Sequence, residues 1–274
     1  MVFLSLPWSL ELYEQTVGRL HRSGQSRDVW VYILMGKTDP DGETHRQQSM
    51  ILVPFDTPGV ELVRNIPVMS HIAPEGHSEL LLRNVRVPAG NLLGREGDGF
   101  MMAQARLGPG RIHHCMRSIG SAERAIEMMV DRGLSREGFG KKLINLGKNM
   151  EVISRARIEV EAMRLMVLRA AKAMDTLGNA EARVWVSAVK AMVPEKCCDI
   201  IDEAIQMHGA AGISQWFPLA DMYHGQRTLR LADGPDEVHH MVVARAEVKT
   251  REHERATLGV SGQHTSKGRI FTGP

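Results

Sequence analysis

The feature that most constrains the fold of this 274-residue chain is a change of pattern at GREGDGF, residues 94–100. Before it, short runs rich in β-branched and aromatic residues alternate with segments that carry Pro, Gly and Asp, which is typical of strands and turns. After it, apolar residues recur every three or four positions, which is typical of helices. The sequence therefore predicts a partial β region followed by a helical region.

Four strands are expected in the first region, at residues 30–36, 48–56, 59–65 and 77–88. Strands at this spacing suggest part of an antiparallel sheet or barrel. Long helices are expected at about 100–133, 146–177 and 180–208, and shorter ones at 219–232 and 235–257. An irregularity is expected at Gly108–Pro109–Gly110, since proline lacks the N–H that a helix needs. Long helices with brief connections predict a bundle.

These patterns divide the chain into four segments. They are an unmatched leader at 1–28, a partial β domain at 29–96, a helical bundle domain at 97–257 and a disordered tail at 258–274. The opening run MVFLSLPWSLELYE has no basic residue ahead of its apolar stretch and carries Glu11 and Glu14. It therefore predicts neither a secretory signal nor a transit peptide.

Composition excludes several classes of protein. The net charge is +2, from 34 Lys and Arg against 32 Asp and Glu, so no broad basic field for nucleic acid is expected. Three cysteines, two of them adjacent, make no disulfide framework and indicate a reducing, intracellular compartment. No run of 18 apolar residues occurs, so no transmembrane segment is expected.

Two histidine pairs, His113–His114 and His239–His240, are the candidates for a metal site. Adjacent residues on a helix point about 100° apart and cannot share one ion, and no H-E-x-x-H motif accompanies them. No metal is therefore expected. The sequence also contains no G-x-G-x-x-G, no phosphate-binding G-x-x-x-x-G-K-[ST] and no G-x-S-x-G.

The stretch RLADGPDEVHH, residues 230–240, has two readings. In the first, Asp233 is only the polar residue before a helix, with Gly234 and Pro235 at the N-cap and first turn. Asp236 and Glu237 would then offset the positive end of the helix dipole. In the second reading, Asp233 is a working base.

Two further stretches also have both a structural and a functional interpretation. SREGFGKKL, residues 135–143, places a basic residue, a glycine and an aromatic residue between helices, which suits an anionic group against backbone N–H donors. The alternative is a plain connection with Phe139 buried. AIQMHGAAG, residues 204–212, is typical of a helix with a glycine-rich end, and its small residues would let another molecule approach the backbone.

The four stretches RLGPGRIHH (106–114), SREGFGKKL, AIQMHGAAGIS (204–214) and RLADGPDEVHH occur in an order that resembles the C-terminal part of the acyl-CoA dehydrogenase family. The resemblance covers about residues 29–257 and is strongest to the branch of family members 10 and 11. It implies a mainly α, truncated acyl-CoA dehydrogenase-like fold with a partial antiparallel β region and a C-terminal four-helix bundle. It further implies FAD as cofactor, an acyl-CoA substrate, a homodimer or homotetramer, and electron-transfer flavoprotein as partner.

The resemblance also assigns roles to residues. It makes Asp233 the catalytic base that removes the Cα proton, before a Cβ hydride passes to the flavin. The substrate-binding positions are Gly108, Arg111 and Gly234. The cofactor-binding positions are Arg136, Phe139, Gln206, His208, Gly209, Ala210, Pro235, Asp236 and Glu237. Those between 136 and 210 match motifs that touch the FAD of a neighbouring subunit.

The chain departs from the family pattern at four points. Asp233 replaces a glutamate, Ala232 replaces a tyrosine and Pro235 replaces a threonine. The roomier pocket that results suits a branched or substituted acyl chain. The fourth departure is that residues 1–28 resemble neither the N-terminal helical domain nor the β segments that grip the flavin.

Three hypotheses about function follow. The chain is an acyl-CoA dehydrogenase of fatty acid β-oxidation, a truncated non-catalytic form that acts through oligomerisation, or a catalyst of elimination on hydroxylated acyl-CoA. The resemblance places the protein in mitochondria or peroxisomes if eukaryotic and in the cytoplasm if bacterial.

Overall fold

The computed structural model describes residues 31–71 and 77–258. The chain divides into two compact units, one ending at Leu107 and the other beginning at Gly108. The predicted leader (1–28) and the predicted tail lie outside the described residues, apart from Leu258, which ends the last helix.

The first unit contains small antiparallel sheets, as predicted. Strand β1 (Val31–Lys37) pairs with β2 (Gln48–Pro54) over its whole length, and β2 also pairs with the short β5 (Leu92–Leu93). Strands β3 (Val60–Asn65) and β4 (Ser78–Leu82) form a second antiparallel pair. Two 3₁₀ turns, at Thr44–Arg46 and Ala89–Asn91, complete this part.

Helix α2 (Gly99–Ser135) begins in the glycine-rich loop and continues into the second unit. The expected irregularity at Gly108–Pro109–Gly110 does not end the helix, because all three residues are helical and Pro109 lies inside it. Proline in a helix removes one i→i−4 hydrogen bond without having to stop the helix. The prediction of a helix over 100–133 is confirmed.

Two more long helices follow. Helix α3 (Asn149–Glu181) contains Gly178 in a non-helical conformation, with φ 81° and ψ 171°, so its regular part ends at Leu177 as predicted. Helix α4 (Arg183–His208) also has a proline inside it. Between α2 and α3 lie β6 (Glu137–Gly138), β7 (Lys141–Lys142) and a 3₁₀ turn at Leu143–Asn145.

The strands β6 and β7 form a tight antiparallel hairpin whose two turn residues both have positive φ. Phe139 has φ 54° and Gly140 has φ 72°, which is the pattern of a type I′ turn. This conformation is uncommon for a bulky residue, and the Phe139 side chain is 100% exposed. The alternative with Phe139 buried in a connection is therefore wrong.

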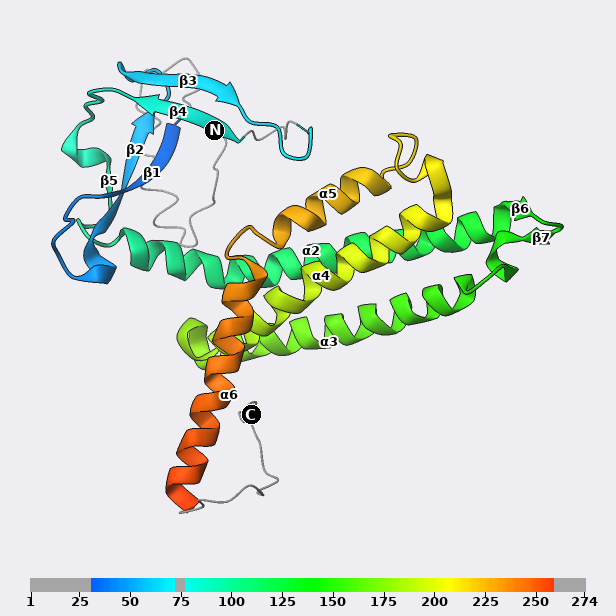
Figure 1. Cartoon of the computed structure of the whole chain (residues 1–274). Coiled ribbons are helices and arrows are strands. Elements are labelled where there is room, and N and C mark those ends of the chain that lie inside the picture. Colours follow the sequence, from blue (N-terminus) through cyan, green and yellow to red (C-terminus); the bar gives the residue numbers. More distant parts are fainter. Residues whose placement is uncertain (1–30, 72–76, 259–274) are drawn as a thin grey trace. The chain divides into compact units, whose positions relative to one another are not determined.

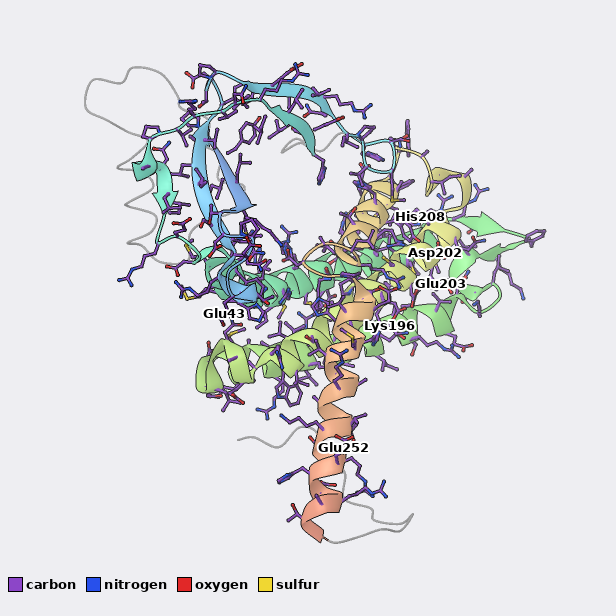
Figure 2. All side chains as sticks on the ribbon, turned by 60° about the vertical axis from the view of Figure 1, so that its left-hand side comes forward. Glu43, Lys196, Asp202, Glu203, His208 and Glu252 are labelled. Atoms are coloured by element: carbon purple, nitrogen blue, oxygen red, sulfur yellow. The ribbon has the colours of Figure 1, made fainter. Side chains whose placement is uncertain are left out.

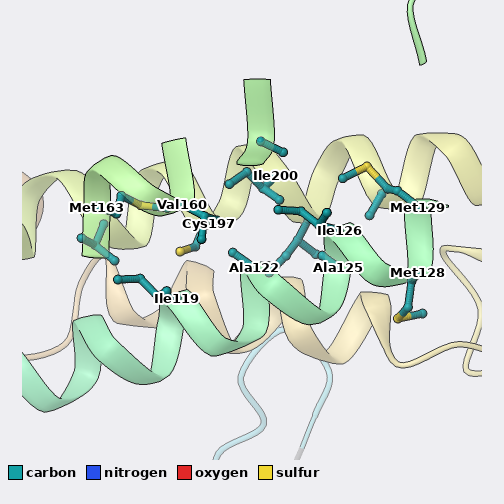
Figure 3. Packing of buried hydrophobic residues seen from close by; sticks show 14 of the residues in the cluster. Ile119, Ala122, Ala125, Ile126, Met128, Met129, Val160, Met163, Cys197 and Ile200 are labelled. Carbon is teal, nitrogen blue, oxygen red and sulfur yellow. The ribbon is translucent and has the colours of Figure 1, made fainter. Parts of the chain in front are cut away.

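The core of the second unit lies between α2, α3 and α4 (Figure 3). It is built from small and medium apolar side chains with interspersed methionine and cysteine. The labelled members are Ile119, Ala122, Ala125, Ile126, Met128, Met129, Val160, Met163, Cys197 and Ile200. Alanines alternate with larger side chains in this cluster, and together they fill the space between the three helices.

Helix α4 is the centre of this unit. It packs against α3, α5 (Leu219–Leu229) and α6 (Asp236–Leu258), and α6 crosses it as Figure 1 shows. A 3₁₀ turn at Gly209–Ala211 ends α4 before the chain returns through α5. The predicted mainly helical fold is confirmed. Within the described residues, no helix is long and apolar enough to cross a membrane.

Candidate active site

The loop between α5 and α6 carries Asp233 in a left-handed backbone conformation. Asp233 has φ 57° and Gly234 has φ 104°. The N–H of Asp236 donates to the carbonyl of Arg230 at 3.1 Å, which closes the loop. A Cβ on Gly234 would lie 3.0 Å from Nε2 of His239, so both the backbone angle and the space require glycine there.

Lys190 on α4 ties this loop to the centre of the bundle. Its side chain is 0% exposed, and its Nζ donates to the carbonyls of Leu229 (2.5 Å) and Gly234 (3.3 Å). Burial lowers the pKa of Lys190, and the nearby charges of Asp236 and Asp233 act in the opposite direction. An ammonium group here satisfies two carbonyls at the two ends of the loop.

Two side chains from other helices hold the backbone carbonyl of Asp233. Arg111 on α2 donates from Nε at 2.9 Å, and His239 on α6 lies with Nε2 at 3.2 Å. Because a carbonyl can only accept, Nε2 of His239 carries the hydrogen. Its Nδ1 then accepts from the Ser187 hydroxyl, 3.3 Å away. The carbonyl of Asp233 thus has fixed donors on α2 and on α6.

His239 is buried and neutral at pH 7. Burial lowers its pKa to about 4, and the positive charges of Lys190 and Arg111 act in the same direction. A protonated His239 would add a third positive group beside these two. Neutral imidazole is therefore the form that suits the loop.

A test of this neutral histidine is the pH dependence of stability. The folded-state pKa lies below the ordinary value of 6.5, so the unfolded chain takes up the proton first as pH falls. The contribution of neutral His239 to the free energy of unfolding is fully present above pH 6.5 and is lost as the pH falls toward 4. This contribution is about 3 kcal/mol. Urea unfolding at pH 7 and pH 4.5 should show a smaller loss for His239→Gln than for the native chain. The exposed neighbour gives the control His240→Gln, which should keep the native dependence. Equal losses in all three proteins would contradict the assignment.

The carboxylate of Asp233 faces α2. Its Oδ2 lies 3.3 Å from Nε2 of His114, and the two side chains are 19% and 23% exposed. A Cβ built on Gly110 would lie 3.8 Å from the same oxygen, so the glycine leaves space beside the carboxylate. The carboxylate is therefore held on one side and partly open to solvent.

Asp236, at the start of α6, is engaged in an ion pair. Its Oδ2 lies 2.6 Å from Nε of Arg230, and Arg230 also reaches Glu195 at 3.3 Å. The other oxygen, Oδ1, is buried without a hydrogen-bond partner among the described residues. Pro235 is half-buried and Glu237 is exposed. The first turn of α6 is thus anchored to α4 through Arg230.

The predicted site residues fall into two groups. Around the α5–α6 loop lie Arg111, Asp233, Gly234, Pro235, Asp236 and Glu237. Gly108 packs against the side chain of Asn179. At the C-terminal ends of α2 and α4 lie Arg136, Phe139, Gln206, His208, Gly209 and Ala210. Figure 2 shows His208 farther along α4 than Lys196. His208 lies 18 positions after Lys190 on α4, a distance of about 27 Å along the helix, so one chain does not bring the two groups together.

The second group is mostly exposed. Gln206, Gly209, Ala210 and Arg136 lie on the surface, as does Phe139. His208 is the exception, because its ring packs edge-on against Phe217 at 4.7 Å and its Nδ1 donates to the carbonyl of Ala204 at 2.8 Å. Burial lowers the pKa of His208, and the charge of Arg132 on α2 lowers it further.

Three residues around Asp233 were not predicted as part of a site: His114, Lys190 and His239. The two histidines were considered only as metal ligands, and within the described residues no group of three metal-ligating side chains is found. A signal for His114 is its position three residues after Arg111, which puts both on one face of a helix. A signal for Lys190 is a lone lysine inside the apolar run VSAVKAMV.

Long packed helices that follow small antiparallel sheets along the chain are also found in solved acyl-CoA dehydrogenase structures, which this fold resembles. The sequence model described as "Acyl-CoA dehydrogenase, C-terminal domain" matches residues 97–248. The chain belongs to the acyl-CoA dehydrogenase family.

Individual relatives agree with this assignment. The chain is 53% identical over 231 residues to the probable acyl-CoA dehydrogenase FadE2 of Mycobacterium tuberculosis, covering 84% of this chain and 56% of that protein. It is 49% identical over 227 residues to acyl-CoA dehydrogenase family member 11 of Rattus norvegicus, covering 82% and 29%. A solved structure from Mycobacterium abscessus, described as a candidate acyl-CoA dehydrogenase, is 49% identical with a TM-score of 0.78. The match covers 81% of this chain and 55% of that chain.

Proposed function

We propose that this chain takes part in the FAD-dependent dehydrogenation of an acyl-CoA, with Asp233 as the base that removes the Cα proton. The observation that carries the proposal is the Asp233 carboxylate itself. It is partly open, beside a glycine, and its backbone is hydrogen-bonded by Arg111 and His239. A base must be presented to substrate in one orientation, and these contacts supply that orientation.

Removal of the Cα proton places two requirements on this site. The Cα proton of a thioester is far less acidic than a carboxylic acid, so donors to the thioester oxygen must stabilise the enolate that forms. In addition, an acyl chain that covers the carboxylate removes water from it and raises its affinity for the proton. In the proposed complex, Arg111 and Gly234 lie beside the acyl-CoA, and Asp233 receives the proton from Cα.

FAD, when bound, supplies the acceptor for the hydride that leaves Cβ. The exposed residues of the second group, at the C-terminal ends of α2 and α4, suit contacts to such a cofactor. Arg136 is exposed and makes no ion pair within the described residues, which suits a pyrophosphate. Phe139 offers an exposed ring, and Gly209 and Ala210 let a large group approach the backbone. The residues Gln206, His208, Pro235, Asp236 and Glu237 complete the proposed contacts.

The distance along α4 between the Asp233 loop and the second group has a consequence for the oligomeric state. The second group, which includes Arg136, lies about 27 Å along α4 from the Asp233 loop. An FAD bound at the loop of one chain is therefore expected to contact the second group of another chain. We therefore propose a homodimer or homotetramer in which each chain contacts its neighbour's FAD. Electron-transfer flavoprotein is the proposed acceptor of the electrons.

The proposal is tested by flavin binding. The purified chain, incubated with FAD and passed through gel filtration, should elute as an oligomer with the absorption bands of oxidised flavin. Arg136→Gln should weaken FAD binding by about tenfold or more, since a charge-assisted hydrogen bond contributes about 1.5–3 kcal/mol. The matched control is Arg155→Gln, an exposed arginine paired with Glu151 on α3, which should bind FAD normally.

Other outcomes would support the alternatives. A colourless oligomer would contradict the proposal and support a non-catalytic chain that acts through oligomerisation. Turnover of a hydroxylated acyl-CoA without net reduction of the flavin would support elimination instead of oxidation.

A further inference from the structure

We propose that His114 is a positioning residue for Asp233, donating a hydrogen bond from Nε2 to the Oδ2 atom and holding the carboxylate in one orientation. The inference rests on the proposed role of Asp233 as the base. The two atoms lie 3.3 Å apart, and each side chain is mostly buried.

The hydrogen-bond partners of the ring decide which nitrogen carries the hydrogen. Nδ1 of His114 lies 3.4 Å from Nη2 of Arg117 on the same helix. A guanidinium group can only donate, so Nδ1 is the acceptor of that contact. The neutral ring then has its hydrogen on Nε2, the nitrogen that faces Asp233. His114 therefore acts as a donor to the carboxylate without needing a charge of its own.

The arrangement follows from helix geometry. Arg111 and His114 are three residues apart on α2 and so lie on one face of the helix. Arg111 holds the backbone carbonyl of Asp233, and His114 contacts the side-chain carboxylate. One face of α2 thereby holds both the backbone carbonyl and the side-chain carboxylate of Asp233. Gly110, next to Arg111, leaves space beside Oδ2.

The charges around the pair come from three helices. Arg111 and Arg117 lie on α2, Lys190 lies on α4, and Asp236 and His239 lie on α6. Burial lowers the pKa of Arg111 and of Lys190, and the nearby charge of Asp233 acts in the opposite direction on both. His114 adds a directional hydrogen bond to the carboxylate oxygen. This bond fixes the orientation of the carboxylate, which a base with a short side chain requires.

The coupling can be measured without any turnover. Imidazole ¹⁵N NMR of the full chain should show His114 with its hydrogen on Nε2. Asp233→Asn should shift the Nε2 resonance of His114, because the acceptor in direct contact changes from a carboxylate to an amide. His113, exposed and adjacent on the same helix, is the internal control and should keep its resonances in both proteins. An unchanged His114 resonance, or a hydrogen on Nδ1, would overturn the inference.

Kinetics separate positioning from a purely structural role. His114→Leu removes the donor and should lower kcat about tenfold with little change in KM, whereas His114→Gln keeps an N–H at similar reach and should recover most of it. His113→Gln should behave like the native chain. Native kcat in His114→Leu, at equal flavin content, would contradict positioning. A chain without turnover but with the NMR coupling would refute the proposed function and leave the contact established.

Discussion

Asp233→Asn should lower the rate of acyl-CoA-dependent flavin reduction by about 10³-fold while FAD stays bound. General-base catalysis contributes about 10²–10⁴-fold, and an amide cannot take up the Cα proton. The amide has nearly the shape of the carboxylate, so the loop contacts of the backbone carbonyl to Arg111 and His239 should persist. Anaerobic stopped-flow measurement of flavin bleaching is the direct assay.

The matched variant is Asp233→Glu. It keeps the carboxylate and lengthens the side chain by one bond, so it should retain far more activity than Asp233→Asn. Space for the longer side chain exists beside Gly110, whose added Cβ would lie 3.8 Å from Oδ2. Bleaching at the native rate in Asp233→Asn would remove Asp233 from the role of base.

Lys190→Met should destabilise the helical unit by about 2 kcal/mol. Methionine keeps much of the length of the side chain but leaves the carbonyls of Leu229 and Gly234 without their donor. A buried acceptor without a partner costs about 1–3 kcal/mol, and removal of a buried ammonium group offsets part of the loss. Urea unfolding followed by circular dichroism measures the change in free energy of unfolding.

The control for this prediction lies on the same helix. Lys196 is 39% exposed and pairs with Glu159 and Asp199 at the surface. Surface ion pairs of this kind contribute little, so Lys196→Met should change stability by no more than about 0.5 kcal/mol. A loss in Lys190→Met no larger than in Lys196→Met would contradict the anchoring role of Lys190.

Lys190 and Asp233 belong to the same local structure, the loop between α5 and α6 and its anchor on α4. Lys190 donates to the carbonyls at the ends of the loop, and Asp233, the proposed base, lies at its turn. Lys190→Met should therefore also lower kcat in the folded protein, because the loop loses a fixed contact. The proposed FAD contacts at the far end of α4, from Gln206 to Ala210, should be little affected.

The secondary structure could be predicted from the sequence to a large extent, because it depends on local pattern. Apolar residues at helical spacing predicted the three long helices, and Gly178 marked the end of the regular part of α3. The glycine-rich loop marked the change from strands to helices ahead of α2. The order of four short motifs also pointed to Asp233 and to the family, because those residues follow one another along the chain.

The surroundings of Asp233 were decided only by the tertiary structure. His114 lies 119 residues before Asp233, and Lys190 lies 44 residues before Gly234. No local pattern states which face of α2 or α4 turns toward the α5–α6 loop, because helix packing sets those directions. The same holds for Phe139, whose full exposure depends on the hairpin turn. The sequence indicated the proposed base and the family, because both depend on residues that are neighbours along the chain, whereas helix packing determined which side chains contact Asp233.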